Sequence, residues 1–347
     1  MTQITKKSGW LSVHLYYNEP WEIFLTKAIE PYIRTTLDTG IAEQFFFIRY
    51  WDRGPHIRLR IKGQQDLFQQ LLRPNLEEHF LSYFDSIPST RTDPNYPKAF
   101  PDDLKWLPNN TVQYIDYQPE RERYGGTVGL QLAESHFHLS SSIVLAMLRQ
   151  QGSDWHYDDA MGAAIKLHLS FVAAAGFDAT EAFHFFNFFF SNWLPHSFRY
   201  FHKRLSKQEY LQQADETLEA FRLAFESQKD ILLPYHESLW EALMDEEAVF
   251  EEKLLNEWIE GNRKLKLRID DAFEHNSIRR PFDYEFSPVL KQRLSRAQMV
   301  RWMFYADYLH MTNNRLGVLN KDEGYLAYLM KECLQAFCFP SRTTQKH

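Results

Sequence analysis

The chain has 347 residues and a mass of 41.4 kDa, with 44% hydrophobic and 24% charged residues, which excludes disordered, collagenous and coiled-coil proteins. Its 39 Lys and Arg against 46 Asp and Glu leave a net charge of −7, which argues against general binding to nucleic acid. Cys333 and Cys338 are too few for a disulfide scaffold, and the most apolar segment, 183–194, is too short to span a membrane. We therefore expect a cytoplasmic protein without a membrane span.

The first third of the chain carries the period-2 pattern of β-strands. Alternating apolar and polar residues predict strands over 10–17, 45–50, 56–62 and 112–117. Helical spacing predicts helices over 21–36 and 67–84. The turn-rich residues 52–55 indicate that the second and third strands form a hairpin, and the five prolines of 87–108 indicate an irregular excursion.

From about Gly129 the hydrophobic period changes to that of an α-helix. The predicted helices are a first one from Leu130 through Val144, then 160–175, the aromatic segment after Asp178, 208–228, 246–273, 295–312 and 322–337. The sequence therefore predicts an α+β protein, with an N-terminal, mostly antiparallel sheet and helices, followed by a mainly helical C-terminal half. No linker divides the chain, so we expect one domain, 1–347, or two packed lobes, 1–126 and 127–347.

Common cofactor motifs are absent from the sequence. It contains no phosphate-binding P-loop, no dinucleotide-binding G-x-G-x-x-G after a strand, no G-x-S-x-G and no H-E-x-x-H. Cys333 and Cys338 do not have the spacing of a metal site, and the 14 histidines are scattered. We expect no cofactor and no bound metal.

Arginines occur where side chains should be partly sheltered. Arg49 ends a Phe-rich strand, Arg58 and Arg60 share one face of the next strand, and Arg123 precedes a Gly-Gly turn. Because a sheltered guanidinium stays charged, it requires an anionic partner. One interpretation is structural pairing with nearby carboxylates, namely Asp52, Asp116, Glu120 and Glu122. The other is an anion pocket that binds a carboxylate or a developing oxyanion.

A second polar cluster lies in the predicted helix 295–312 and just beyond it. His310 and Asn314 are four residues apart and share a helical face, and Asp307 is three residues before His310. This spacing suggests that Asp307 orients the imidazole, which can exchange protons near neutral pH. A helical His with a nearby Asp is also common on protein surfaces, so the cluster gains weight only if it faces the arginines.

Three blocks of sequence resemble the C-terminal elimination domain of class I lantibiotic dehydratases and the related thiopeptide-type bacteriocin biosynthesis proteins. They are FFFIRYWDRGPHIRLRIKG at 45–63, YQPERERYGG at 117–126 followed by AESHFHLSS at 133–141, and HMTNNRLGV at 310–318. The blocks occur in the order found in that family and span most of the chain. The resemblance therefore implies a stand-alone protein made of this one domain.

In full-length members of that family, a first domain uses glutamyl-tRNA to esterify Ser or Thr of a precursor peptide. The elimination domain then removes glutamate to leave dehydroalanine or dehydrobutyrine. Because the resemblance covers only the second part, it implies a lyase that is the elimination subunit of a split dehydratase in antibiotic biosynthesis. Its expected partners are the precursor peptide, with leader and core, and a separate glutamylating subunit, which would itself bind the tRNA. Whether the chain forms a homodimer stays open.

The resemblance also implies the residues of the site. The expected catalytic residues are Arg58 and Arg123, which would clamp the glutamyl carboxylate and the developing oxyanion, and His310, which would act as acid or base. The residues expected to bind the substrate are Arg49, Arg60, Glu120, Asn314 and Arg315.

Two other functions remain open at this stage. Stand-alone relatives include thiopeptide pyridine synthases, which join two dehydroalanines in a formal aza-[4+2] cycloaddition and expel the leader. The chain could also be a non-catalytic subunit that presents a peptide to its partner. No role follows from the sequence for 87–108 or 246–268.

Overall fold

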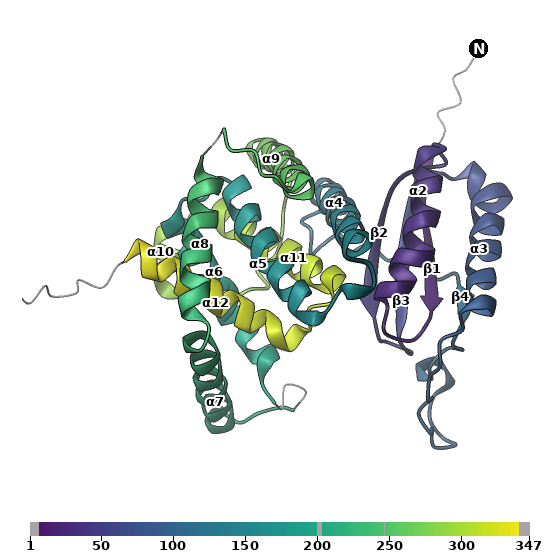
Figure 1. The fold of residues 1–347 in the computed structure, drawn as a ribbon, viewed down its shortest axis with the longest axis horizontal. Coiled ribbons are helices and arrows are strands. Elements are labelled where there is room, and N and C mark those ends of the chain that lie inside the picture. The colour runs from purple at the N-terminus through teal and green to yellow at the C-terminus, as the bar shows by residue number, and fades with distance from the viewer. Residues whose placement is uncertain (1–6, 200–202, 246, 340–347) are drawn as a thin grey trace, which may run out of the picture. The chain divides into compact units, whose positions relative to one another are not determined.

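The computed structural model describes residues 7–199, 203–245 and 247–339, which form two compact units. Unit 1 contains the described residues up to Glu120 together with Glu134–His156. Unit 2 contains Arg121–Ala133 and the described residues from Tyr157 onward. The long helix α4 (Thr127–Gln151) contributes its first residues to unit 2 and the remainder to unit 1. The ribbon of the chain is drawn in Figure 1.

Unit 1 is built on a four-stranded antiparallel sheet with the order β2-β3-β1-β4. The strands are β1 (Ser8–Tyr16), β2 (Ala42–Tyr50), β3 (His56–Gln64) and β4 (Thr111–Gln113). The predicted hairpin is confirmed as β2 and β3. The predicted fourth strand over 112–117 is largely wrong, because β4 pairs only with the end of β1, from His14 to Tyr16.

Helices of unit 1 cover the apolar face of this sheet. The predicted helix 21–36 is a continuous run of α1 (Glu22–Phe24), the π-helix η1 (Leu25–Ile29) and α2 (Glu30–Asp38). Pro31 does not break it, because it lies at the start of α2, where the missing N–H costs little. The second helix consists of η2 (Phe68–Leu72) and α3 (Arg73–Ser86). Between α3 and β4 the proline-rich stretch is irregular, as predicted, apart from the short η3 (Asp102–Leu104).

The part of α4 in unit 1 lies along the outer edge of β2. The backbone N–H of Phe47 donates to the Ser141 hydroxyl of α4 at 3.2 Å, so the edge strand has a hydrogen-bonding partner other than water. On the face of the sheet that carries Arg60, the ring centre of Phe46 lies 5.4 Å from that of Phe137. These contacts secure the sheet face that carries Arg58 and Arg60.

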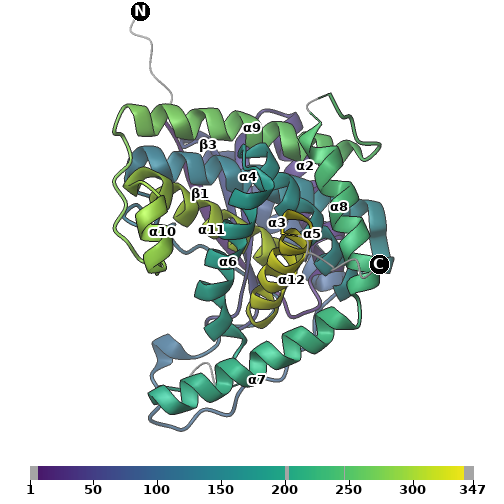
Figure 2. The same ribbon diagram turned by 90° about the vertical axis from the view of Figure 1, so that its left-hand side faces the viewer.

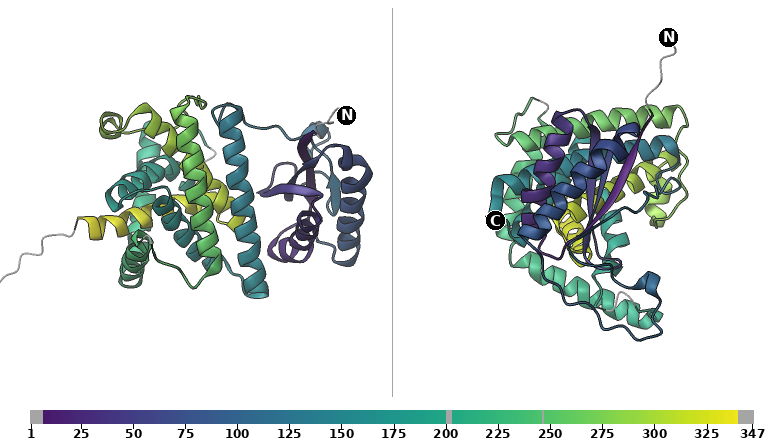
Figure 3. Two further views of the ribbon diagram at one scale, coloured as in Figure 1. Left: turned by 90° about the horizontal axis from the view of Figure 1, so that it is seen from above. Right: turned by 90° about the vertical axis from the view of Figure 1, so that its right-hand side faces the viewer.

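The regular secondary structure of unit 2 is helical among its described residues (Figures 2 and 3). Its helices are the start of α4, α5 (Tyr157–Ala174), α6 (Ala179–Trp193), α7 (Lys207–Glu226), α8 (Lys229–Met244), α9 (Lys253–Glu274), α10 (Pro288–Arg293), α11 (Arg296–Leu316) and α12 (Asn320–Cys338). Short 3₁₀ turns, η4 (Gly152–Asp154) in unit 1 and η5 (Leu194–Ser197) in unit 2, connect some of the helices. An α+β architecture with the sheet first and helices after it is therefore confirmed.

Local capping residues start several of these helices where the sequence indicates. Asp178 accepts a hydrogen bond from the backbone N–H of Glu181 at 2.7 Å and starts α6. Ser295 and Gln298 form a capping box that starts α11. The predicted helix 246–273 is wrong at its start, because α9 begins at Lys253. Residues 229–244 form α8 despite the interior Pro234, which normally argues against a helix.

Aromatic side chains dominate the core of unit 2. Helix α6 packs along α12, and Phe185, Phe186 and Trp302 are almost fully buried there. The apolar segment 183–194 is therefore a buried helix, as predicted. Among the described residues, no helix is both long enough and apolar enough to cross a membrane.

Candidate functional site

Asp307 of α11 lies at the centre of a buried charge cluster in unit 2. Its side chain is 1% exposed, and it accepts hydrogen bonds from Arg123 at 2.6 Å, Arg280 at 2.6 Å and the Tyr284 hydroxyl at 2.8 Å. Arg280 also donates to Asp283 at 2.9 Å. Two guanidinium groups therefore face two carboxylates, and the charges within this cluster balance.

The turn of 121–126 places Arg123 against Asp307. Gly125 has φ of +67° and Gly126 has φ of +106°, conformations that residues with a side chain rarely adopt. A Cβ on Gly125 would lie 2.7 Å from Cγ2 of Ile278, and the Gly125 carbonyl accepts a hydrogen bond from the backbone N–H of Arg279 at 2.9 Å. The paired glycines thus allow a close approach of the turn to the segment that supplies Arg280.

His310 of α11 forms its hydrogen bonds with Glu323 of α12. The Nδ1 atom is 2.9 Å from Glu323 Oε1 and 3.1 Å from Oε2, and Asn313 donates to the same carboxylate at 3.1 Å. Glu323 is fully buried, whereas the His310 side chain is 24% exposed and its ring lies 5.2 Å from that of Trp193. The hydrogen bonds that His310 makes with described residues all use Nδ1, so Nε2 bonds none of them.

The surroundings of His310 favour its protonated form. Burial by itself lowers the pKa of His310, but the Glu323 carboxylate, by charge and by hydrogen bond, raises it further than burial lowers it. Asp307 adds to the rise and Arg123 opposes it, so both charges lie within electrostatic range. The resulting pKa is above the ordinary value, and His310 is suited to donate a proton near neutral pH.

The expectation that Asp307 orients His310 is therefore wrong. Asp307 is three residues before His310 on the helix, but its two oxygens are occupied by Arg123, Arg280 and Tyr284. Glu323 takes the orienting role because the packing of α12 against α11 brings its carboxylate to Nδ1.

The polar face of the sheet in unit 1 carries the second set of predicted residues. His14 lies opposite Arg58 and Ser12 opposite Arg60 in the β1–β3 register, so their side chains share one face. Arg60 is 5% exposed, and its Nε and Nη1 have no hydrogen-bond partner among the described residues. Its guanidinium lies 5.3 Å from the ring centre of Tyr117, and burial lowers its pKa to about 10. A buried cation with unused donors is the arrangement expected of an anion or carbonyl site.

Arg49 does not belong to this face. It lies opposite Ile57, which points to the apolar side of the sheet, and its guanidinium is 2.6 Å from Glu22 of α1. Its side chain is 5% exposed. Because alternate residues of a strand point to opposite faces, Arg49 and Arg58 are separated by the sheet. Arg49 therefore does not share a face with Arg58 and Arg60, the other strand arginines expected at the site.

The remaining predicted residues have different surroundings. Glu120 is exposed on unit 1 and acts on Tyr117 only through its charge. Asn314 is half-buried on α11. Arg315 is fully buried and donates to the Met311 carbonyl of its own helix at 2.6 Å, and burial lowers its pKa to about 9. Of the predicted residues in unit 2, Arg123 belongs to the charge cluster, and His310 lies within electrostatic range of it.

Sequence reasoning missed Glu323, Arg280, Tyr284 and Trp193. Glu323 lies in the first turn of α12, where an acidic residue is already favoured by the helix dipole, so its presence carries no catalytic signal. Arg280 and Tyr284 lie in a segment without regular structure between α9 and α10. No local spacing links these residues to His310 or Arg123.

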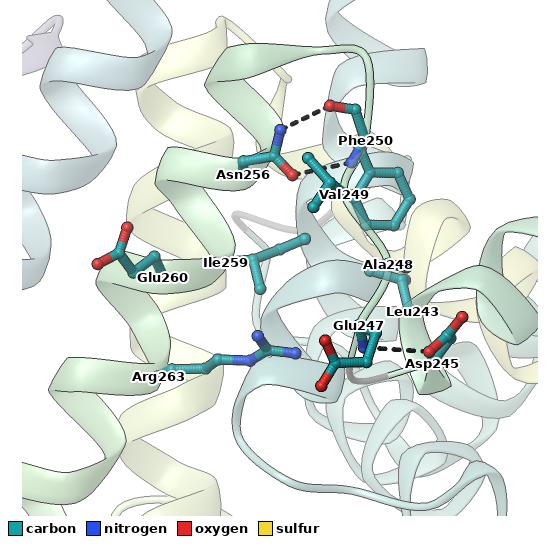
Figure 4. Close-up of a pocket in the computed structure, with 10 residues that line it drawn as sticks. All are labelled: Leu243, Asp245, Glu247, Ala248, Val249, Phe250, Asn256, Ile259, Glu260 and Arg263. Carbon is teal, nitrogen blue, oxygen red and sulfur yellow. Dashed lines mark hydrogen bonds between the residues drawn. The ribbon is translucent and has the colours of Figure 1, made fainter.

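A separate pocket of about 380 Å³ lies in unit 2 where the chain connects α8 to α9 (Figure 4). The Asn256 amide bonds both the carbonyl and the N–H of Phe250, at 2.7 and 3.0 Å, and Arg263 extends from α9 toward Glu247. None of the predicted site residues lines it. Among the described residues, no group of three or more His, Cys, Asp or Glu is arranged to hold a metal ion.

Comparisons with known proteins agree with this fold. The family "Lantibiotic biosynthesis dehydratase C-term" matches residues 10–334. The chain is 31% identical over 130 residues to the "Nisin biosynthesis protein NisB" of Lactococcus lactis subsp. lactis, and this match spans 35% of the chain but only 10% of that longer protein.

Solved structures extend the likeness to nearly the whole chain. The pyridine synthase TbtD from thiomuracin biosynthesis has a TM-score of 0.69 at 15% identity, covering 94% of this chain and 97% of its own. TsrL has a TM-score of 0.67 at 17% identity and 95% coverage of both chains. The tRNA-dependent lantibiotic dehydratase MibB from Microbispora sp. 107891 has a TM-score of 0.57 at 18% identity, and 28% of its chain is covered.

Proposed function

We propose that this chain modifies a ribosomally made precursor peptide, because it belongs to the family "Lantibiotic biosynthesis dehydratase C-term". We further propose that its reaction is pyridine formation, in which two dehydroalanines join in a formal aza-[4+2] cycloaddition and the leader leaves. The likeness of fold to the pyridine synthase TbtD over nearly the whole chain supports this reaction.

The observation that carries the choice is the ion pairing of Arg123. Its guanidinium is bound to Asp307, which Arg280 and Tyr284 also contact, so the cluster holds no surplus positive charge. Expulsion of glutamate produces a free carboxylate, and the two guanidinium groups of this cluster in unit 2, Arg123 and Arg280, already have carboxylate partners and are not available to receive it. Pyridine formation releases water and the leader amide, and neither product carries a charge.

His310 supplies the proton transfer that this reaction needs. Cycloaddition forms two carbon–carbon bonds and keeps every atom, and aromatisation then expels water and the leader as its amide. In the loss of water and again in the loss of the leader amide, the departing group takes up one proton and a ring carbon loses one proton. The imidazolium of His310, held at Nδ1 by Glu323, donates a proton to the departing group and then accepts the proton that leaves the ring carbon.

We assign the cationic face of the sheet, which carries Arg58 and Arg60, to binding the backbone of the peptide. Formation of the azadiene requires one amide to react as its iminol, and negative charge builds on that oxygen. Arg58 and the unused donors of Arg60 stabilise this oxygen by charge and hydrogen bonds.

Glutamate elimination is the second candidate, and residue matches favour it. Arg58, Arg123 and His310 are all present in the sequence blocks that resemble elimination domains, and the identity with the nisin protein is the highest of the comparisons described above. In this reaction a base removes the Cα proton, the arginines stabilise the enolate-like charge, and glutamate leaves. A separate glutamylating subunit would have to supply the substrate.

Mass spectrometry of two peptide reactions tests the proposal. Purified protein is mixed either with a precursor that contains two dehydroalanines or with one that carries glutamylated Ser. We expect loss of water and of the leader from the first peptide, and no such change with a His310→Ala variant. Loss of one glutamate per modified residue from the second peptide, with the first unchanged, would replace pyridine formation by elimination. No mass change in either reaction would indicate a non-catalytic peptide-binding subunit.

A further inference from the structure

His56 is a fully buried histidine beside Arg58 on β3 of unit 1. Its Nδ1 lies 2.8 Å from the Gly54 carbonyl in the hairpin turn, and its Nε2 lies 3.3 Å from Nε of Arg58. Three rings surround the imidazole: His14 and Tyr16 stack on it at 4.9 and 4.5 Å, and Tyr50 meets it edge-on at 5.7 Å.

The two hydrogen bonds define one tautomer of His56. A carbonyl oxygen can only accept, so Nδ1 carries the proton, and the Nε–H of Arg58 can only donate, so Nε2 carries the lone pair. Burial, together with the positive charges of Arg58 and Arg60, lowers the pKa of His56 to about 4, although the Gly54 carbonyl opposes this. The ring is therefore neutral at physiological pH.

This imidazole and one aromatic ring restrict the guanidinium of Arg58. Its carbon lies 3.4 Å from the ring centre of Tyr50, so its plane rests on the ring while Nε is held by His56. Among the described residues, no carboxylate forms an ion pair with Arg58, and its terminal nitrogens remain free for a ligand. The side chain is thus held at one end and open at the other.

We propose that His56 is a positioning residue, which accepts the Nε–H of Arg58 and presents the two terminal nitrogens of that arginine to a developing oxyanion on the peptide substrate. The inference rests on the proposed function, because it requires Arg58 to act on the substrate. It adds a residue that neither the sequence motifs nor the arginine pattern identified. The rings of His14, Tyr16 and Tyr50 hold the imidazole plane of His56, and the Gly54 carbonyl holds its tautomer.

Three variants separate positioning from simple support of the fold. His56→Phe keeps an aromatic ring among its neighbours but removes the acceptor, and His56→Gln restores an acceptor near the position of Nε2. His79→Phe is the matched control, because His79 also bonds a backbone carbonyl, that of Ala28 at 2.9 Å, but lies on α3 away from Arg58. Thermal unfolding of all three measures the loss of stability.

We expect His56→Phe to lower kcat/KM by about tenfold to a hundredfold, the range that the loss of a hydrogen bond to a charged group gives. His56→Gln should recover part of this loss, and His79→Phe should keep the unmodified rate. Because His56 acts through Arg58, adding His56→Phe to Arg58→Lys should cost little beyond Arg58→Lys alone. Unchanged turnover in His56→Phe, while Arg58→Lys cripples the protein, would overturn the positioning role and leave the function intact. Unchanged turnover in Arg58→Lys would remove Arg58 from the reaction and with it the premise of the inference, whereas no conversion of the dehydroalanine peptide by the unmodified protein would remove the proposed function itself.

A spectroscopic readout tests the inference without activity. The ¹⁵N spectrum of protein labelled at histidine distinguishes a protonated Nδ1 from a protonated Nε2, and the signal of His56 is assigned by its absence in His56→Gln. A protonated Nδ1 supports the hydrogen-bond arrangement. A protonated Nε2 would contradict it, since that atom could then not accept from Arg58.

Discussion

His310 and Glu323 are 13 residues apart in sequence and lie on different helices, yet Nδ1 of the imidazole is 2.9 Å from Oε1 of the carboxylate. The carboxylate is fully buried and the imidazole is partly exposed. This pairing makes His310 a stronger candidate for proton transfer than its helical neighbours indicate, because a buried negative charge holds the imidazolium in place.

Replacement of Glu323 by Gln should move the pH dependence of the reaction. The variant keeps the shape of the side chain and can still bond Nδ1, but it removes the charge that raises the pKa of His310, so burial then lowers that pKa. We expect the alkaline limb of the pH–rate profile to shift to lower pH. Glu332→Gln, on the same helix but paired with Lys331, is the control. An unshifted profile in the Glu323 variant would separate this carboxylate from the proton transfer.

Loss of either arginine of the motif blocks, Arg58 or Arg123, should reduce turnover without unfolding the protein. Arg58→Ala removes a cation from a position of developing charge, which typically costs about 10²-fold to 10³-fold in rate, and Arg123→Ala removes the ion pair with Asp307 on the helix that carries His310. Asp307 keeps Arg280 and Tyr284 as partners when Arg123 is removed, so its buried charge stays compensated. Single-turnover kinetics measure the effect, and Arg121→Ala, at an exposed position of the same turn, is the control. A variant of Arg58 or Arg123 that converts substrate at the unmodified rate would remove that residue from the site.

Buried histidines should make the protein less stable in acid. Burial lowers the pKa of His14 to about 2, of His168 to about 3 and of His236 to about 4, whereas the unfolded chain protonates these groups near pH 6.5. The unfolded state therefore binds more protons below pH 6.5, and stability falls as the pH drops from there toward 4. Each such histidine should cost about 1 to 2 kcal/mol at pH 5.

The variant His236→Leu tests this acid effect. Its side chain is buried in α8, where Nδ1 bonds the Leu232 carbonyl of the same helix at 2.8 Å. Denaturant unfolding between pH 7 and pH 5 should show a smaller loss of stability in the variant than in the unmodified protein. His310 acts in the opposite sense, because its raised pKa contributes stability that is lost as the pH rises. Equal slopes in the two proteins would show that His236 is not protonated on unfolding in this window.

Gly125→Ala should weaken the turn that carries Arg123. The added Cβ meets Ile278 at 2.7 Å, and φ of +67° is strained for alanine, so we expect a loss of about 1 to 3 kcal/mol in the free energy of unfolding. Gly162→Ala is the control, since that helical position has open space and should gain up to about 1 kcal/mol. Thermal unfolding measures both. If Gly125→Ala were as stable as Gly162→Ala, the close approach of the turn to 278–279 would not matter to the fold.

Elements with a strong local pattern are the ones that sequence reasoning recovered. The hairpin of β2 and β3 follows from alternation around a turn-rich loop, and the start of α6 follows from Asp178 and Glu181. The helix α8 was missed because Pro234 outweighs the apolar pattern around it, although tertiary packing keeps the helix intact. The strand predicted over 112–117 lacks a partner for most of its length, and partners are not visible in a local pattern.

The amino-acid sequence alone determined the class of fold, the candidates Arg58, Arg123 and His310, and the family, because these depend on residue spacing and on contiguous motifs. Only the tertiary structure decided which charges meet. It paired His310 with Glu323 rather than Asp307, joined Arg123 to Asp307, and turned Arg49 to the face opposite Arg58. The physical reason is that hydrogen bonds and ion pairs act over a few ångströms, and residues far apart in sequence reach that range only when helices and strands pack.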